Sequence, residues 1–373
     1  MHRELNTSTN PLQIGAVTLK TPTALAPMEG VTDRAFRRLI RGVGGCGLTV
    51  TEFVSSEGIS RDDRRAWANA ELDPDEHPVS IQIYGRNPEK LARAAQRCAA
   101  LGADMIDLNL GCPSKAVTSG CAGSALMREP ARAAEIFAAV FEAIEVPMTV
   151  KMRLGWDDDR RNAPEIASLA VQAGAELITV HGRTRQQLYR GQADWAALRE
   201  VKAAIGERPL LVNGDILTAE DARLALELSG AQGVMIGRGA LRDPWVFRRV
   251  SAALAGQAFE EPSLTERRTL LVRYFDQLQR DAKSERHAIG RIKKITGLFA
   301  RGLPYCDQLR EEIFPQQQLA PIYDALQRWF DRLERESIDD GFLRLHGARR
   351  VDEELDQREA RYAVFDRGAS VAT

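Results

Sequence analysis

One cysteine, Cys112, has sequence neighbours that suit proton chemistry. Cys112 lies in the run NLGCPSK (109–115), where Pro113 ends an apolar strand and Gly111 loosens the turn. A thiol at such a strand end could act as a nucleophile, a metal ligand or a proton donor. A nucleophile requires an adjacent base and a metal requires partners at ligand spacing, and the sequence shows neither beside Cys112. Proton donation requires only a neutral thiol close to the substrate.

Two basic side chains end neighbouring predicted strands. Lys151 follows the run MTV (148–150), and His181 follows the run LITV (177–180). A lone histidine in such a place is usually a hydrogen-bonded core residue. Because a lysine ends the adjacent strand, we expect the two side chains to face a shared anionic ligand.

Two further strand ends combine glycine with charge. Glycine allows backbone N–H groups to approach a phosphate, and helices expected to begin at Thr218 and Ala240 would direct their N-termini at the same anion. In a barrel, the ends of the last two strands commonly bind phosphate. The predicted phosphate site consists of Asn213, Gly214, Asp215, Gly237 and Arg238.

The elements that must position these residues alternate between strands and helices. The strand candidates are short and mostly apolar: Thr23–Met28, Leu48–Val54, Val79–Tyr84, Met105–Leu110, Met148–Met152, Leu177–His181, Leu210–Asn213 and Val234–Gly237. The helical patterns between them are Pro88–Leu101, Pro130–Ile144, Pro164–Ala173, Trp195–Ile205 and Ala219–Leu228. Asn87 and Thr218 are the expected N-caps. This alternation predicts a (β/α)₈ barrel. A doubly wound sheet is the competing architecture, but APMEG (26–30) is not its glycine-rich fingerprint.

Nearly every predicted strand ends in a polar residue although its body is apolar. A solvated strand end explains any one of them, whereas a series at one face of a barrel indicates a binding site. The series consists of Glu29, Glu52, Gln82, Asn109, Lys151, Arg153, His181, Asn213 and Arg238.

The β pattern stops near residue 262. Thr265–Asp281, His287–Arg301 and Leu319–Arg335 repeat apolar residues at three- and four-residue spacing, which predicts helices. We expect a catalytic barrel over residues 1–258, a helical domain over 259–336, and a charged tail over 337–373 that is partly disordered.

Composition excludes several classes of protein. The formal net charge is −1, so a nucleic-acid site would have to be a local basic face. No apolar run reaches the length of a membrane span, and residues 1–10 lack the apolar core of a secretory signal. The cysteines form no CxxC pair, which argues against structural zinc and a disulfide scaffold: Cys46, Cys98, Cys112, Cys121 and Cys306. We expect a cytoplasmic protein without a metal site.

Six runs resemble those of the tRNA-dihydrouridine synthase family. They cover the whole barrel in order: LAPMEGVTD (25–33), DLNLGCPSK (107–115), VKMRLG (150–155), VHGRTR (180–185), VNGDI (212–216) and VMIGRG (234–239). The resemblance continues into residues 291–305, and GWDDDRRNAPEI (155–166) is most similar to the bacterial B-type subfamily. SGCAG (119–123) departs from the expected pattern, because a second cysteine, Cys121, is not expected there and could serve as an oxidation partner.

The resemblance implies FMN at the barrel mouth, reduced by NADPH, with hydride delivery to C6 of uracil and protonation of C5 by Cys112. It implies that Pro27, Met28 and Glu29 line the flavin, that Gln82, Lys151 and His181 bond to its ring system, and that the phosphate site above holds its ribityl phosphate. Asn109 would position the substrate base. The helical domain would grip tRNA, with phosphate contacts from Arg291, Lys293 and Lys294. We expect a monomer.

Two rival functions remain. An FMN barrel acting on a free pyrimidine, similar to dihydroorotate dehydrogenase, would not need the additional helical domain. A non-catalytic RNA-binding factor on the same scaffold would not bind flavin, so the absorbance spectrum of the purified protein distinguishes it.

Overall fold

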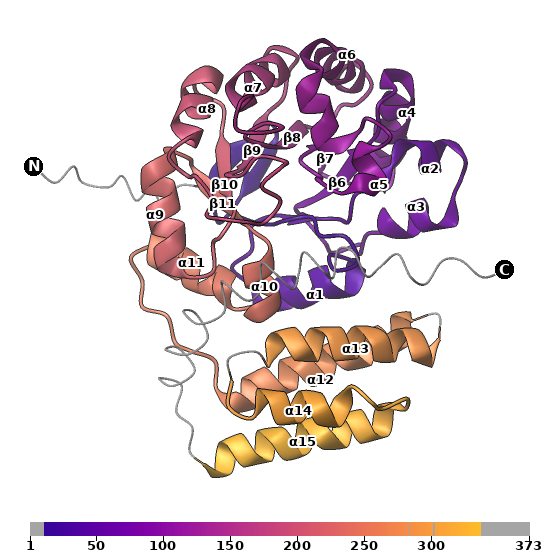
Figure 1. The fold of residues 1–373 in the computed structure, drawn as a ribbon, viewed down its shortest axis with the longest axis vertical. Coiled ribbons are helices and arrows are strands. Elements are labelled where there is room, and N and C mark those ends of the chain that lie inside the picture. The colour runs from indigo at the N-terminus through magenta and orange to yellow at the C-terminus, as the bar shows by residue number, and fades with distance from the viewer. Residues whose placement is uncertain (1–10, 283, 301–302, 337–373) are drawn as a thin grey trace, which may run out of the picture. The chain divides into compact units, whose positions relative to one another are not determined.

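The computed structural model describes residues 11–282, 284–300 and 303–336 (Figure 1). The chain divides into two compact units. The first consists of the residues up to Ala240 together with Val246–Ala258, and the second takes in Leu241–Trp245 and the chain from Phe259. The predicted tail over 337–373 lies outside the described residues.

Parallel strands alternate with helices in the first unit and close into a barrel. The barrel strands are β3 (Thr23–Leu25), β4 (Thr49–Val50), β6 (Val79–Tyr84), β7 (Met105–Leu110), β8 (Met148–Arg153), β9 (Leu177–His181), β10 (Leu210–Asn213) and β11 (Gly233–Ile236). Hydrogen-bonded neighbours follow the order β3-β11-β10-β9-β8-β7-β6-β4. The ring closes where the Leu25 N–H donates to the Leu48 carbonyl at 2.8 Å. The strand bodies are buried, as expected when both faces are covered. The predicted (β/α)₈ barrel is confirmed.

Amphipathic helices surround the strands (Figure 1). They are α1 (Arg34–Val43), α4 (Pro88–Ala99), α6 (Pro130–Phe141), α7 (Ala163–Gln172), α8 (Leu198–Ile205), α9 (Ala219–Ser229) and α11 (Val246–Leu254). Both predicted N-caps are confirmed: the Asn87 side chain accepts from the Lys90 N–H, and Thr218 forms a capping box with Asp221.

A short hairpin covers the N-terminal end of the barrel. Its strands β1 (Leu12–Ile14) and β2 (Val17–Leu19) are antiparallel and turn at Gly15, whose φ of +54° favours glycine. Ile14 and Leu19 are buried in one cluster with the first residues of barrel strands, such as Met105 and Leu177. The hairpin was not predicted, and it leaves the C-terminal strand ends as the open face of the barrel.

Short elements follow several strand ends and correct three predictions. They are β5 (Val54–Ser55), α2 (Ser56–Ser60), α3 (Arg64–Asn69), α5 (Lys115–Thr118), the 3₁₀ helix η1 (Gly123–Arg128) and α10 (Arg238–Arg242). The strand predicted over Leu48–Val54 is therefore two short strands. The strand predicted to reach Met28 ends at Leu25, because Met28 enters a tight turn in which its carbonyl accepts from the Thr32 N–H at 3.0 Å. Ala240 does not begin a helix, because its N–H already donates to the Gly237 carbonyl at 2.9 Å inside the first turn of α10.

The second unit is helical. It contains α12 (Leu264–Asp281), α13 (Glu285–Phe299), α14 (Cys306–Ile313) and α15 (Leu319–Arg335), which pack side by side in Figure 1. Their buried faces include Phe275, Ile292, Ile313 and Phe330. Three of these helices match the predicted periodic segments, whereas α14 was not predicted.

Candidate active site

The loop after β7 holds Cys112 by its backbone. The Asn109 Oδ1 atom accepts from the N–H groups of Gly111 at 3.0 Å and Cys112 at 2.8 Å. The Cys112 carbonyl accepts from the N–H of Ser124 at 3.2 Å and from its hydroxyl at 2.9 Å, so η1 fixes the loop from the other side. The thiol donates to the Ser114 hydroxyl at 3.4 Å.

The Cys112 thiol is kept in its neutral form. Burial raises its pKa above the ordinary thiol value, and the hydrogen bonds with Ser114 only partly oppose this shift. Reactive nucleophilic cysteines have lowered pKa values instead. The arrangement therefore favours proton donation over nucleophilic attack. All five cysteines, including Cys121, are free.

A buried hydrogen-bond chain lies behind Asn109. Its Nδ2 donates to Gln82 Oε1 at 2.8 Å, and Gln82 Nε2 donates to Asp107 Oδ2 at 2.6 Å. The other Asp107 oxygen accepts from the Thr149 hydroxyl at 2.6 Å. The structure thus brings together Gln82, Asn109 and Cys112, and it adds Asp107, which was not predicted as a site residue.

Lys151 is a half-buried cation that feels the charge of Asp107 but forms no ion pair with it. Its Cα pairs with that of Asn109 across β7 and β8, and its ammonium makes no hydrogen bond or ion pair with any residue in the described part of the chain. Burial, with help from the Arg153 charge, lowers its pKa to about 8. An ammonium in this state is suited to an anionic ligand, which would restore the charged form.

His181 ends β9 next to β8 and β10 and is neutral. Burial lowers its pKa well below the ordinary histidine value, and the charges of Arg153 and Lys151 lower it further. Its Nε2 atom lies 3.4 Å from an Arg183 guanidinium nitrogen. A neutral imidazole can donate or accept a hydrogen bond but adds no positive charge to the site.

Asp215 binds arginines and does not face an anion directly. Its carboxylate accepts from Arg183 at 2.6 and 2.8 Å, from Arg238 at 3.0 Å and from the Ala193 N–H at 2.7 Å. Gly214 precedes it with a φ of +109°, and a Cβ there would lie 3.0 Å from the His181 ring. Asp215 therefore orients Arg238, which remains the cation of the predicted phosphate site.

Two buried arginines shape the loop after β9. Arg153 donates to the carbonyls of Gly111, Thr184 and Leu188 at 2.8 to 3.0 Å. Arg183 donates to the carbonyls of Arg190 and Gly191. The loop folds around both guanidiniums and places the Tyr189 ring 4.8 Å from the Arg238 guanidinium carbon. The sequence did not predict that the two arginines would hold this loop. An arginine within an otherwise apolar strand, as at Arg153, could have indicated it.

The remaining predicted contacts lie at the ends of β10 and β11 and in the segment that follows β3. Asn213 Nδ2 donates to the Met235 carbonyl at 2.7 Å. A Cβ at Gly237 would lie 3.6 Å from the Met28 sulfur, which places Met28 beside the predicted phosphate site. Pro27 is half-buried. The Glu29 side chain is half-exposed and lies 3.9 Å from Arg65, so its charge faces outwards.

The predicted tRNA contacts lie on α13 of the helical unit. Burial lowers the pKa of Arg291 to about 10, and Lys294 is exposed. Lys293 donates its ammonium to the carbonyls of Phe314 and Gln316, which stabilises the end of α14. The exposed face of the same helix also carries Arg286.

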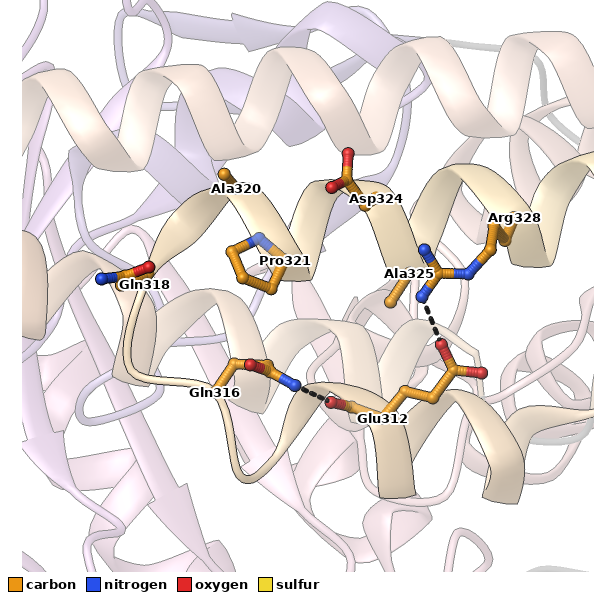
Figure 2. Close-up of a pocket in the computed structure, with 8 residues that line it drawn as sticks. All are labelled: Glu312, Gln316, Gln318, Ala320, Pro321, Asp324, Ala325 and Arg328. Atoms are coloured by element: carbon orange, nitrogen blue, oxygen red, sulfur yellow. Dashed lines mark hydrogen bonds and ion pairs between the residues drawn. The ribbon is translucent and has the colours of Figure 1, made fainter.

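Two hollows on the surface are lined by none of the predicted site residues. One, of about 380 Å³, lies between α14 and α15 and is bordered by the Glu312–Arg328 ion pair and Pro321 (Figure 2). The other, of about 620 Å³, adjoins the β1–β2 hairpin. None of the described helices is both long and apolar enough to cross a membrane. Among the described residues, no His, Cys, Asp and Glu side chains cluster as metal ligands.

Comparisons with known proteins identify the family. Residues 24–330 match the family described as "Dihydrouridine synthase (Dus)". The chain is 40% identical over 301 residues to a probable tRNA-dihydrouridine synthase of Rickettsia conorii, covering 80% of this chain and 90% of that protein. It is 47% identical over 249 residues to one of Rhodobacter capsulatus, covering 66% and 76%. It is 40% identical over 302 residues to tRNA-dihydrouridine synthase B of Pseudomonas aeruginosa, covering 81% and 90%. The chain belongs to the dihydrouridine synthase family, a family of flavin-dependent oxidoreductases.

Proposed function

We propose that this chain reduces the C5–C6 bond of specific uridines in tRNA to 5,6-dihydrouridine, with FMN as its flavin and NADPH as the reductant. One observation carries the proposal: the neutral thiol of Cys112 lies at the same barrel end as Lys151, a half-buried cation that forms no ion pair among the described residues. The family membership and the relatives named as tRNA-dihydrouridine synthases support the same reading.

The residues at the barrel end fit FMN. Lys151 forms no ion pair among the described residues, and its lowered pKa indicates a cation that an anionic ligand would stabilise. Arg238 is held by Asp215 at 3.0 Å and provides a second cation for a phosphate. When bound, FMN supplies the hydride that reduces the uracil ring.

Three of the proposed FMN contacts would have distinct tasks. Lys151 would neutralise negative charge on the ring system, and neutral His181 would hydrogen-bond to it without adding charge. Gln82 has its amide in the chain behind Cys112, which uses one of its two N–H groups, and the second would bond to the flavin only if the fully buried side chain became accessible. The other proposed contacts are Pro27, Met28, Glu29, Asn213, Gly214, Asp215 and Gly237.

Cys112 would donate its proton to C5 of the uracil. Reduction requires a hydride at C6 and a proton at C5, and the negative charge left at C5 without the proton is far more basic than a thiolate. A thiol with a raised pKa therefore still transfers its proton and remains protonated between turnovers. Asn109 would hold Cys112 through the backbone and present its remaining N–H to the base.

The helical unit would bind tRNA phosphates through Arg291, Lys293 and Lys294 on α13. Lys293 has an additional structural task, because its ammonium already bonds to the end of α14. We further propose a cytoplasmic monomer of the B type.

The test is reconstitution with purified protein, NADPH and a tRNA transcript that carries no modified bases. Mass spectrometry of the digested RNA should show uridine that has gained two hydrogens, at defined positions. The same reaction with free uridine or orotate should show no reduction. Reduction of the free pyrimidine with no change in the tRNA would overturn the proposal in favour of a small-molecule oxidoreductase.

A further inference from the structure

We infer that Asp107 is a positioning residue for Cys112 and that it acts by fixing the orientation of the two amides between them. The inference rests on the role proposed for Cys112 and adds what holds that residue in place. The amides belong to Gln82 and Asn109, which link the carboxylate to the Cys112 backbone.

The direction of this hydrogen-bond chain follows from its charged end. An ionised carboxylate only accepts hydrogen bonds, so Gln82 must turn its NH₂ group towards Asp107. The Gln82 carbonyl then faces Asn109 and can only accept, so Asn109 must present its own NH₂ group. This leaves Asn109 Oδ1 for the N–H groups of Gly111 and Cys112. If Asn109 were turned by half a rotation, its NH₂ group would face two donors, and the loop could not keep its place.

Burial prevents water from replacing any link. Gln82 is 0% exposed, Asp107 3% and Asn109 6%. A buried polar group without a partner is costly, and hydrogen bonds in such surroundings polarise one another. Burial raises the pKa of Asp107, whereas the hydrogen bonds from Thr149 and Gln82 and the charge of Lys151 lower it. The net shift is upward, but each carboxylate oxygen accepts a hydrogen bond from its own donor, Gln82 or Thr149, which is the geometry of the acceptor-only form.

If Asp107 were only structural, it would stabilise the barrel, but its charge would not set the orientation of the two amides that hold Cys112. Moving the negative charge one link along the hydrogen-bond chain, from position 107 to position 82, distinguishes these possibilities. Gln82→Glu sets two carboxylates against each other, so the chain breaks once both are ionised, at the alkaline end of the pH range tested. Asp107→Asn leaves an amide that can face Gln82 with either end, so the direction is no longer enforced. The double variant D107N/Q82E restores an acceptor-only group in the chain, which again requires Asn109 to donate its NH₂ group.

The readout is alkylation of Cys112 by iodoacetamide in the protein as purified, followed by peptide mass spectrometry from pH 7 to 10. Thiol reactivity does not depend on turnover, so this readout remains valid if Cys112 proves not to be the proton donor. In Gln82→Glu, a loosened loop should expose the thiol to water, and its alkylation near pH 10 should be faster than in the unmodified protein by about tenfold or more. Asp107→Asn should be intermediate, and the double variant should return to within about threefold of the unmodified protein.

Ser80→Ala is the matched control. It removes a buried hydroxyl that donates to the Met105 carbonyl at 3.3 Å between the same two strands, but it does not touch the chain. It should lower the melting temperature without changing the Cys112 profile. Two results would overturn the inference: a Gln82→Glu profile equal to that of the unmodified protein, or a double variant as reactive as Gln82→Glu alone. A Cys112→Ala enzyme with full activity would instead refute only the proposed proton donor.

Discussion

At the scale of single residues, the site depends on ionisable groups whose pKa values are shifted from their ordinary values. Lys151 carries a pKa of about 8, Cys112 stays protonated and His181 stays neutral, and burial is the largest cause in each case. These groups are buried because the strand ends that carry them lie inside the closed barrel. The chemistry of these residues is therefore a property of the fold as well as of the side chains.

The lowered pKa of Lys151 predicts a pH-dependent affinity for FMN. Below pH 8 the ammonium is charged and can pair with an anion, whereas above pH 8 the free protein loses this charge. Binding must then take up a proton, so the Kd for FMN should rise with pH by up to about tenfold per unit above pH 8. Titration of flavin-free protein with FMN between pH 7 and pH 9 measures this slope.

Lys151→Ala should bind FMN more weakly at pH 7 and should lose the pH dependence. Lys202→Ala is a suitable control, because this lysine bonds to the backbone of its own helix end and lies in α8. A steep slope that persists in Lys151→Ala would show that another group is responsible.

At the scale of elements, the loop after β9 depends on buried charge. Arg183 is 1% exposed, and Asp215 is the carboxylate that pairs with it. Asp215→Asn should leave this guanidinium unpaired and should lower the free energy of unfolding by about 3 kcal/mol. Arg238 should also lose its anchor, so FMN affinity should fall in the same variant.

Chemical denaturation and FMN titration measure both effects. Glu220→Gln removes an exposed ion pair with Arg223 and should change neither quantity measurably. Equal stabilities of Asp215→Asn and Glu220→Gln would contradict the assigned role of the buried pair.

The sequence predicted the barrel well and its rim poorly. Strands such as Val79–Tyr84 and Met105–Leu110 have the predicted bounds, and nearly all of their residues are buried, as expected for strands covered on both faces. The β1–β2 hairpin has three-residue strands, too short for a periodic pattern, and it is stabilised by contacts with distant strand starts. The short rim element η1 depends on local contacts that leave no periodic pattern, such as the two hydrogen bonds from Ser124 to the Cys112 carbonyl.

The same distinction applies to the candidate site. Strand-end positions indicated Gln82, Lys151 and His181 because barrel geometry brings such residues together. Asp107 lies within a strand, and its role depends on contacts with side chains of two neighbouring strands. Its type and position in the sequence do not reveal those contacts.

At the scale of the whole molecule, the near-neutral total charge makes the local distribution decisive. The exposed face of α13 carries Arg286 and Lys294, whereas Lys293 is engaged with α14. Reversing Arg286 and Lys294 to Glu should weaken tRNA binding and reduce the salt dependence by about one unit of slope for each lost phosphate contact. NADPH oxidation without tRNA should remain unchanged.

Filter binding at several salt concentrations provides this measurement. Arg328→Glu with Glu312→Arg is a control on α15, because it inverts an exposed ion pair without changing the net charge. An unchanged salt dependence in the α13 variant would exclude that face from the tRNA interface.

The central claim is that Cys112 supplies the proton at C5. Its most direct test is a single turnover with pre-reduced flavin and unmodified tRNA, in which flavin reoxidation and dihydrouridine are followed together. Cys112→Ala should retain FMN and accept electrons from NADPH, but dihydrouridine formation should slow by about 10² to 10⁴-fold, as expected for loss of a general acid. Cys112→Ser should restore little, since a hydroxyl is a much weaker acid, and Cys121→Ala should react like the unmodified enzyme. An unchanged rate in Cys112→Ala, or an equal loss in Cys121→Ala, would contradict the assignment.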